Sequence, residues 1–283
     1  MADTEVQVFD SEEELAVSLA KCTTDLSDKF CKERDAFTVV VSGGSLIKSQ
    51  FHEISLRKKL AEKHLWRFSL INPWTYPHAE VKPESAACSR IEQRQSKGSR
   101  SYLIDCGVTG CLLVFNIVED GNTEIKTIPI PAGHVYAIND TLSAEGAADD
   151  YETCLKHLIK SNIVDISKES GFPKFDIMLL GMGPDGHVAS LFPGHPLVHE
   201  KEKWVTFIND SPKPPSDRIT FTFPVINSSA NIALVAAGAG KADVVHKSLG
   251  DSKSSDLLPV QMVSPEGELI WFLDKAAASK LWG

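Results

Sequence analysis

The chain has 283 residues, of which 42% are hydrophobic and 24% are charged, proportions that are ordinary for a globular protein. This length is enough for one α/β domain or for two smaller ones. The net charge of −9 argues against a surface that binds nucleic acid or an anionic membrane, although a locally positive pocket for an anionic metabolite remains compatible with it. Because the sequence contains no apolar run of about 18 residues, we expect no transmembrane helix.

The N-terminus and the cysteines indicate the compartment. Residues 1–5 are acidic and contain neither the apolar core of a secretory signal nor an arginine-rich transit pattern. The six cysteines include no C-x-x-C pair and no Cys/His spacing typical of a metal site, so we expect reduced thiols and no bound metal. These features predict a cytosolic protein.

The first predicted elements in chain order are a helix and a strand. Residues 12–31 carry apolar side chains at helical spacing, and Ser11 with Glu14 can form a capping box. Residues 36–42 then form a β-branched apolar run, which is typical of a strand buried on both faces.

A glycine turn follows this strand. Gly43, Gly44 and Ser45 end the strand, and we expect a helix to begin at 46–48. A strand, a glycine turn and a helix together can cradle a phosphate, because the N–H groups at the start of a helix point at the ligand. The alternative is an ordinary turn in which Ser45 caps the helix.

The middle of the chain, residues 51–127, differs from the rest. It holds 11 Lys/Arg and 9 Asp/Glu, a net charge of +2, whereas the remaining residues carry −11. Prolines interrupt its beginning, and its periodicity is weak. Short strands at 102–104 and 112–115 are the elements that the pattern suggests there.

From residue 144 onward, predicted helices and strands again alternate. One expected helix covers 144–159, and another follows the turn at 238–241 and runs through 249. The expected strands cover 175–180, 204–208, 219–223, 232–237 and 269–273. Strands that alternate with helices predict a doubly wound, mostly parallel sheet with helices on both faces, a Rossmann-like α/β fold.

The stretch that follows the strand at 175–180 concentrates the candidate chemistry. The strand runs into Gly181, Gly183 and Gly186, and His187 comes next. Glycine lets backbone N–H groups approach a ligand, and open α/β sheets bind ligands where their strands end. An imidazole with an ordinary pKa of ~6.5 can take up and return a proton at neutral pH. The alternative is a tight turn with a solvated histidine, since glycine patterns alone are weak evidence.

These motifs together resemble the 6-phosphogluconolactonase family, and most of all its cytosolic plant type. The resemblance rests on the Gly-Gly-Ser turn, GMGPDGHVASLFP at 181–193, NDSPKPPSDRIT at 209–220, FPVIN at 223–227, GAGKA at 238–242 and WFLD at 271–274. It covers roughly residues 1–50 and 128–283. Several separate motifs in the same order are far more specific than any one of them.

The resemblance implies a single domain over 1–283 with the fold of glucosamine-6-phosphate deaminases and ribose-5-phosphate isomerases. It implies hydrolysis of 6-phospho-D-glucono-1,5-lactone to 6-phospho-D-gluconate, in the oxidative pentose phosphate pathway, without a metal or an organic cofactor. The expected partner is the phosphosugar lactone, with no nucleic acid or membrane, and the chain is expected to be a monomer or a weak homo-oligomer. Deaminases continue the glycine-histidine loop toward Phe-Asn-Glu-Pro, whereas residues 190–193 here hold no carboxylate, which favours a lactonase.

For this reaction we predict that His187 is the general base that activates water. Asp185 either orients His187 or binds sugar hydroxyls, and the alternative is a plain turn residue. Backbone N–H groups around Gly183 to Gly186 are expected to hold the developing oxyanion.

The predicted contacts to the substrate phosphate or carboxylate are Gly43, Gly44, Ser45, Lys213 and Arg218. For Lys213 and Arg218 the alternative is a solvated loop with surface charges. Lys241, after a second glycine turn, is expected to be structural.

The sequence also departs from the family. Lactonases of this type carry a strand that ends in Asp-Glu-Arg, whose arginine is thought to help bind the phosphate, and no such tripeptide occurs here. Residues 66–74 stand in its place, and we expect an inner strand to be lost. The segment is either a genuine divergence or the result of a mis-spliced or frame-shifted coding region. Three hypotheses therefore remain. The chain is an active lactonase, another phosphosugar enzyme such as a deaminase or isomerase, or a non-catalytic member that binds phosphosugars or a partner protein or does not fold stably.

Overall fold

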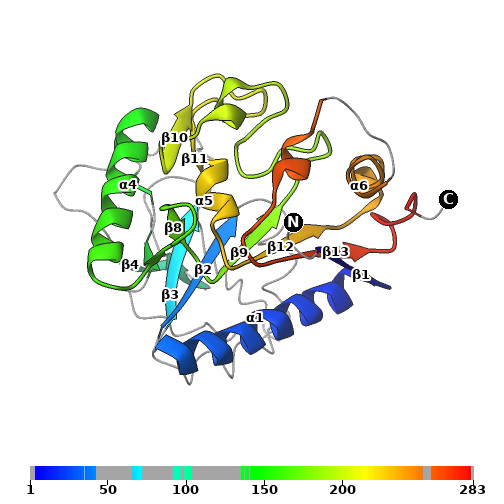
Figure 1. The fold of residues 1–283 in the computed structure, drawn as a ribbon, viewed down its shortest axis with the longest axis horizontal. Helices are drawn as coiled ribbons and strands as arrows, with labels where there is room; N and C mark the ends of the chain where they lie inside the picture. The colour runs from blue at the N-terminus through cyan, green and yellow to red at the C-terminus, as the bar shows by residue number, and fades with distance from the viewer. Residues whose placement is uncertain are drawn as a thin grey trace.

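The computed structural model describes residues 4–34, 36–42, 66–71, 92–96, 99–103, 135–136, 138–139, 141–250 and 256–281. Its centre is a seven-stranded sheet in the order β1-β13-β12-β9-β2-β3-β6, and the pairings between these strands are parallel (Figure 1). The strands are β1 (Thr4–Phe9), β2 (Phe37–Ser42), β3 (Trp66–Ile71), β6 (Val135–Tyr136), β9 (Ile177–Gly181), β12 (Asn231–Ala236) and β13 (Glu268–Asp274).

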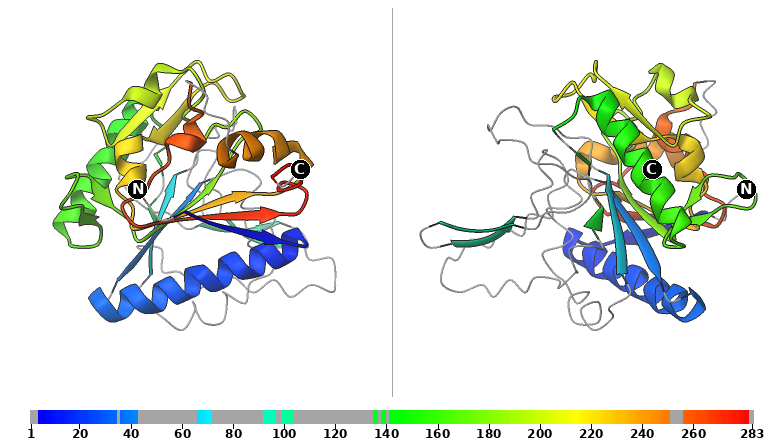
Figure 2. Two further views of the ribbon diagram at one scale, coloured as in Figure 1. Left: turned by 45° about the vertical axis from the view of Figure 1, so that its right-hand side comes forward. Right: turned by 90° about the vertical axis from the view of Figure 1, so that its left-hand side faces the viewer.

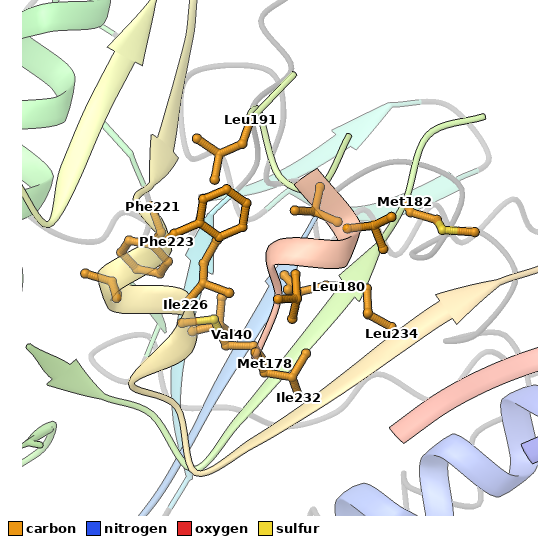
Figure 3. Close-up of a cluster of buried hydrophobic side chains, with 14 of the residues drawn as sticks. Val40, Met178, Leu180, Met182, Leu191, Phe221, Phe223, Ile226, Ile232 and Leu234 are labelled. Atoms are coloured by element: carbon orange, nitrogen blue, oxygen red, sulfur yellow. The ribbon is translucent and has the colours of Figure 1, made fainter. Parts of the chain in front are cut away.

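Apolar side chains alternate across the central strands and build a core on each face of the sheet. In β9, Met178 and Leu180 belong to one core, whereas Ile177 and Leu179 belong to the other. Figure 3 shows the first of these cores, where the β9 side chains meet those of β12 and of the short helix α5 (Phe223–Asn227). Each such side chain contributes about 1.5–3 kcal/mol when it is fully buried. Burial on both faces explains why these strands read as unbroken apolar runs.

Helices cover both faces of the sheet. The long helix α1 (Glu12–Arg34) lies along one face, and α4 (Ala144–Lys160), α5 and α6 (Ala242–Leu249) lie on the other (Figures 1 and 2). The N–H of Glu14 donates to Ser11 Oγ at 3.1 Å, as the predicted cap of α1 requires. Ser143 caps α4 in the same way, through a bond from the N–H of Gly146.

Smaller elements complete the described fold. Strands β10 (Val205–Ile208) and β11 (Arg218–Phe221) form an antiparallel pair next to α4. Two further antiparallel pairs are β4 (Glu92–Ser96) with β5 (Ser99–Leu103), and β7 (Asp165–Ile166) with β8 (Pro173–Lys174). Short 3₁₀ helices cover Pro196–His199, Ala239–Lys241 and Pro259–Met262.

The predicted doubly wound α/β fold is confirmed. The helices and strands expected at 12–31, 36–42 and beyond residue 144 are present, with ends shifted by three residues at most. The expected strand at 102–104 overlaps β5. The helix start at 46–48 and the strand at 112–115 lie outside the described residues.

Two features of the sheet differ from the prediction. Strand β1 was not predicted, and it pairs in parallel with β13, from the other end of the chain. The expected loss of an inner strand is wrong, because Trp66–Ile71 forms β3 between β2 and β6. The apolar residues around Arg67 are therefore sufficient for a strand, although the Asp-Glu-Arg tripeptide is absent from the sequence.

The sheet topology places the candidate loops together. Strand β9 lies between β12 and β2, and because all three are parallel, their carboxyl ends share one edge of the sheet. The loops that follow β9 and β12 thus start side by side at this edge, which is where α/β sheets bind ligands. Among the helices that the structure describes, none has the length and apolar character needed to cross a bilayer.

Candidate active site

The loop after β9 folds back on itself and brings two titratable side chains over a glycine. The N–H of Gly183 donates to the carbonyl of His187 at 2.9 Å, and the N–H of Gly186 donates to the carbonyl of Gly183 at 3.0 Å. A Cβ atom at Gly183 would lie 2.1 Å from His187 Nδ1 and 2.3 Å from Asp185 Oδ1. Only glycine therefore allows these two side chains to pack against the loop.

A second glycine shapes the far side of the loop. Gly186 has a φ of +83°, in the left-handed region that favours glycine, and a Cβ atom there would come within 2.9 Å of Leu258 Cδ1. The carbonyl of Gly186 accepts a hydrogen bond from the N–H of Val260 at 3.0 Å. The 258–260 segment thus supports the loop from behind.

These contacts bear on the prediction for the oxyanion. Backbone N–H groups around Gly183 to Gly186 were expected to hold it, and of these the N–H groups of Gly183 and Gly186 donate to carbonyls within the loop. An N–H group that already donates in a good geometry is not available for a ligand. The two glycines therefore contribute space and backbone conformation rather than these donors.

His187 and Asp185 form a hydrogen-bonded pair. His187 Nδ1 lies 2.6 Å from Asp185 Oδ1, and the His187 side chain is half-buried. Because an ionised carboxylate accepts only, this contact assigns the proton to Nδ1 and the lone pair to Nε2. In the described part of the chain no hydrogen bond uses Nε2, so that nitrogen can face a ligand.

Lys213 completes this cluster from a distant loop. Its Nζ lies 2.9 Å from Asp185 Oδ1 and 3.3 Å from His187 Nδ1. The loop that carries Lys213 connects β10 to β11, and its prolines at 212, 214 and 215 exclude a helix or a central strand. The structure thus places Lys213 against Asp185, and its predicted contact with the substrate stays a prediction.

The cluster shifts the pKa values of both members of the pair. Burial acts to raise the pKa of Asp185, but hydrogen bonds from Lys213 and His187 outweigh it and lower that pKa to about 2. Burial lowers the pKa of His187 below its usual value, the bond to Asp185 opposes this, and the positive charges of Lys213 and Arg218 add to it. At neutral pH the pair is therefore a carboxylate beside a neutral imidazole, which is the form that can accept a proton.

Arg218 and Phe192 lie close to the pair of His187 and Asp185. Arg218, predicted to contact the substrate, is 1% exposed, and it donates through Nε and Nη2 to carbonyls of the loop from Lys213 to Pro215. The Phe192 ring lies 4.6 Å from the imidazole ring of His187, centroid to centroid. Sequence reasoning missed Phe192, because an apolar residue in a loop gives no chemical signal.

Lys241, which was expected to be structural, contacts the start of this loop. Its Nζ donates to the carbonyl of Met182 at 2.7 Å, directly before the glycine loop. Burial lowers the pKa of Lys241, and the positive charge of Lys213 lowers it further. The signal that pointed to it was the glycine turn after β12, because β12 is the strand next to β9.

The structure thus brings together His187, Asp185, Gly183, Gly186 and Lys213, with Arg218 behind them. Gly43, Gly44 and Ser45 lie outside the described residues, although β2, which ends at Ser42, pairs with β9. No group of three or more His, Cys, Asp or Glu side chains within the described ranges is placed to hold a metal ion.

Comparisons with known proteins agree with this fold. Residues 122–271 match the family described as glucosamine-6-phosphate isomerases/6-phosphogluconolactonase. A probable 6-phosphogluconolactonase 4, chloroplastic, of Oryza sativa subsp. japonica is 53% identical over 279 residues, 98% of this chain and 76% of that protein. The probable 6-phosphogluconolactonase 2 of Arabidopsis thaliana is 42% identical, over 99% of this chain and 97% of that protein.

Solved structures show the same fold. The 6-phosphogluconolactonase of Trypanosoma brucei superimposes with a TM-score of 0.70 at 22% identity, covering 99% of this chain and all of that one. A monomeric glucosamine-6-phosphate deaminase superimposes with a TM-score of 0.63 at 18% identity, covering 98% of this chain and 99% of that one. At these identities the likeness concerns the fold alone.

Proposed function

The chain belongs to the family of glucosamine-6-phosphate isomerases and 6-phosphogluconolactonases, and we propose that it hydrolyses 6-phospho-D-glucono-1,5-lactone to 6-phospho-D-gluconate, a step of the oxidative pentose phosphate pathway. The observation that carries this proposal is the cluster of His187, Asp185 and Lys213 at the carboxyl end of β9. The names of the relatives that are 42–53% identical support a lactonase rather than a deaminase.

His187 is the proposed general base. Its Nε2 takes a proton from water while the water oxygen bonds to C1 of the lactone, and the carbonyl oxygen becomes an oxyanion. The oxyanion then collapses, the bond between C1 and the ring oxygen breaks, and the imidazolium returns its proton to the ring oxygen. General acid–base help of this kind is typically worth ~10²–10⁴-fold.

Asp185 and the surrounding cations have supporting roles in this proposal. Asp185 holds the Nδ1 proton of His187, which keeps the Nε2 lone pair aimed away from the loop. Lys213 and Lys241 place positive charge near the pair, and that charge favours both the oxyanion and the substrate phosphate. The predicted phosphate contacts at Gly43, Gly44 and Ser45 remain part of the proposal.

A rate measurement tests the function. Freshly generated 6-phosphogluconolactone is added to the purified chain, and the spontaneous rate is subtracted. We expect hydrolysis clearly above that rate and no release of ammonia from glucosamine 6-phosphate. Ammonia release would favour the deaminase branch of the family. Turnover of neither substrate would favour the non-catalytic hypothesis that the missing Asp-Glu-Arg tripeptide raises.

The other expectations stay proposals as well. We propose a single domain, because β1 and β13 from the two ends of the chain pair in one sheet, and a monomer or weak homo-oligomer. The proposed compartment is the cytosol, while relatives that are 52–53% identical carry a chloroplast label. Imaging of a C-terminal fluorescent fusion expressed from the complete gene decides between the cytosol and the chloroplast.

A further inference from the structure

We infer that Arg218 is a positioning residue, which clamps the loop of Lys213 and the ring of Phe192 so that Lys213 and His187 both meet Asp185. The inference rests on the proposed function, and it assigns Arg218 a role other than the predicted contact with the substrate. Its evidence is a set of contacts that converge on one guanidinium group.

The first contacts are hydrogen bonds to the loop. Arg218 Nε donates to the carbonyl of Pro215 at 2.9 Å, and Nη2 donates to the carbonyls of Lys213 and Pro214 at 2.8 and 3.0 Å. The prolines at 214 and 215 have no N–H to donate, and the Arg218 donors add to the loop's own bond from the N–H of Ser211 to the carbonyl of Ser216 at 3.2 Å. A planar guanidinium with donors at fixed angles can bind three neighbouring carbonyls at once.

The carbonyl of Lys213 is the critical acceptor, because it fixes the start of the Lys213 side chain. Ser211 Oγ also donates to this carbonyl, at 2.8 Å. From this backbone the side chain reaches Asp185, where its Nζ lies 2.9 Å from Oδ1. One end of the residue is thus held by Arg218 and the other end meets the catalytic pair.

The second contact is with Phe192. The Arg218 guanidinium carbon lies 5.5 Å from the centre of the Phe192 ring, and the imidazole of His187 lies 4.6 Å from the same centre. A cation over an aromatic face is attracted to it, and here both groups are largely buried. Phe192 therefore contacts both Arg218 and His187, and through this shared contact a displacement of Arg218 reaches the imidazole.

The geometry distinguishes a clamp from a phosphate ligand. A lysine at 218 keeps a positive charge, but its single ammonium cannot bind three carbonyls in one plane and has no flat face to lie over Phe192. If charge alone mattered, Arg218→Lys would retain most of the activity. If positioning matters, small displacements of Lys213 and His187 lower kcat/KM by about 10²-fold.

The test is a double-mutant cycle with Lys213. The rates of lactone hydrolysis are measured for the native chain, Arg218→Lys, Lys213→Met and the double variant. Residues that act through each other give losses that do not multiply. We expect the double variant to lose much less than the product of the two single losses, whereas multiplying losses would overturn the inference.

Two controls separate positioning from damage to the fold. Arg34→Lys makes the same change at another largely buried arginine, at the opposite end of the sheet, and we expect its activity per folded molecule to stay native. The ¹H–¹⁵N signals of the His187 ring, recorded without substrate, should move in Arg218→Lys and stay in Arg34→Lys. Unchanged His187 signals in a folded Arg218→Lys chain would contradict the inference.

A measurement on the native chain covers the case in which Arg218→Lys does not fold. The Nε–H signal of Arg218 is followed while 6-phosphogluconate is added. A clamp predicts slow hydrogen exchange and little shift, with a larger shift at the Lys213 ammonium. An Arg218 shift as large as that of Lys213 would make it a ligand contact. If the native chain proves inactive, the proposed function fails, while the His187 signals still decide on the clamp.

Discussion

Strand β9 carries an aspartate cluster at each of its ends, and the two clusters are built from similar groups. At the amino end, Asp176 accepts hydrogen bonds from Arg34 and from both the N–H and the hydroxyl of Thr38. At the carboxyl end, Asp185 contacts His187 and Lys213. Each cluster pairs one carboxylate with a cation from a distant part of the chain.

The two clusters differ in burial, and their pKa shifts have opposite directions. The Asp176 side chain is 5% exposed, and burial raises its pKa although Arg34 and Thr38 oppose the shift. Asp185 is 35% exposed, and its donors lower its pKa to about 2. The amino-end cluster is closed by elements of the fold, whereas the carboxyl-end cluster remains open to a ligand. Similar groups therefore serve stability at one end of β9 and, as proposed, chemistry at the other.

The largest effect that separates the two ends is expected for His187→Ala. Loss of the proposed general base should lower kcat by ~10²–10⁴-fold while the free energy of unfolding changes little. Rates are measured after subtraction of spontaneous hydrolysis, with the exposed His157→Ala as the matched control. A His187→Ala chain that turns over at near-native rate removes this residue from the mechanism.

Asp176→Ala is expected to have the opposite effect, with a large loss in the free energy of unfolding and little change in kcat per folded molecule. Arg34 and the Thr38 N–H lose their buried acceptor, and breaking a buried pair in this way costs about 3 kcal/mol of unfolding free energy. Urea unfolding measures this loss. Asp165→Ala removes the exposed partner of the same arginine and should cost less than about 1 kcal/mol. Equal losses in the two variants would show that the amino-end cluster is not the buried anchor.

Gly183→Ala tests the close packing of the carboxyl-end cluster. The new methyl group would occupy the space of His187 Nδ1, 2.1 Å away, so the imidazole must turn out of place. A misplaced base typically costs about 10²-fold in rate. The kcat of Gly183→Ala is compared with that of Gly194→Ala, where a Cβ meets open space although the backbone there is left-handed. A loss confined to Gly183→Ala is the expected result, and similar kcat values would speak against tight packing.

The smallest effects concern pH. The pKa of His187 is lowered chiefly by burial, with the charge of Lys213 adding to the shift and Asp185 opposing it. Because the protonated imidazole cannot act as a base, kcat/KM falls as pH drops through this pKa. This fall is the acid limb of the pH profile of kcat/KM. Lys213→Met removes a positive charge and should move the acid limb to higher pH. Asp185→Asn removes the opposing charge and should move it to lower pH.

The acid limb is measured between pH 4 and 8, where Asp185 stays ionised because its pKa is about 2. Shifts of the two variants in the same direction would contradict the assignment of the limb to His187.

Much of the fold followed from local patterns. Runs such as 37–41 and Asn231–Ala236 are buried on both faces, so their apolar character alone marks them as strands. Strand β1 escaped prediction, because its residues are only partly buried and its place depends on β13 at the other end of the chain. Strand β3 likewise pairs with β2, and the absence of the Asp-Glu-Arg tripeptide gave no information about that pairing.

The sequence by itself determined the α/β fold, the glycine loop and the candidates His187 and Asp185, because glycine spacing and side-chain chemistry are local properties. Only the tertiary structure decided what the distant basic residues do. Lys213 and Arg218 are both basic and five positions apart, yet one reaches Asp185 while the other binds carbonyls of the loop. That choice depends on where a proline-rich loop crosses the carboxyl end of β9, and such contacts between distant segments leave no trace in local sequence.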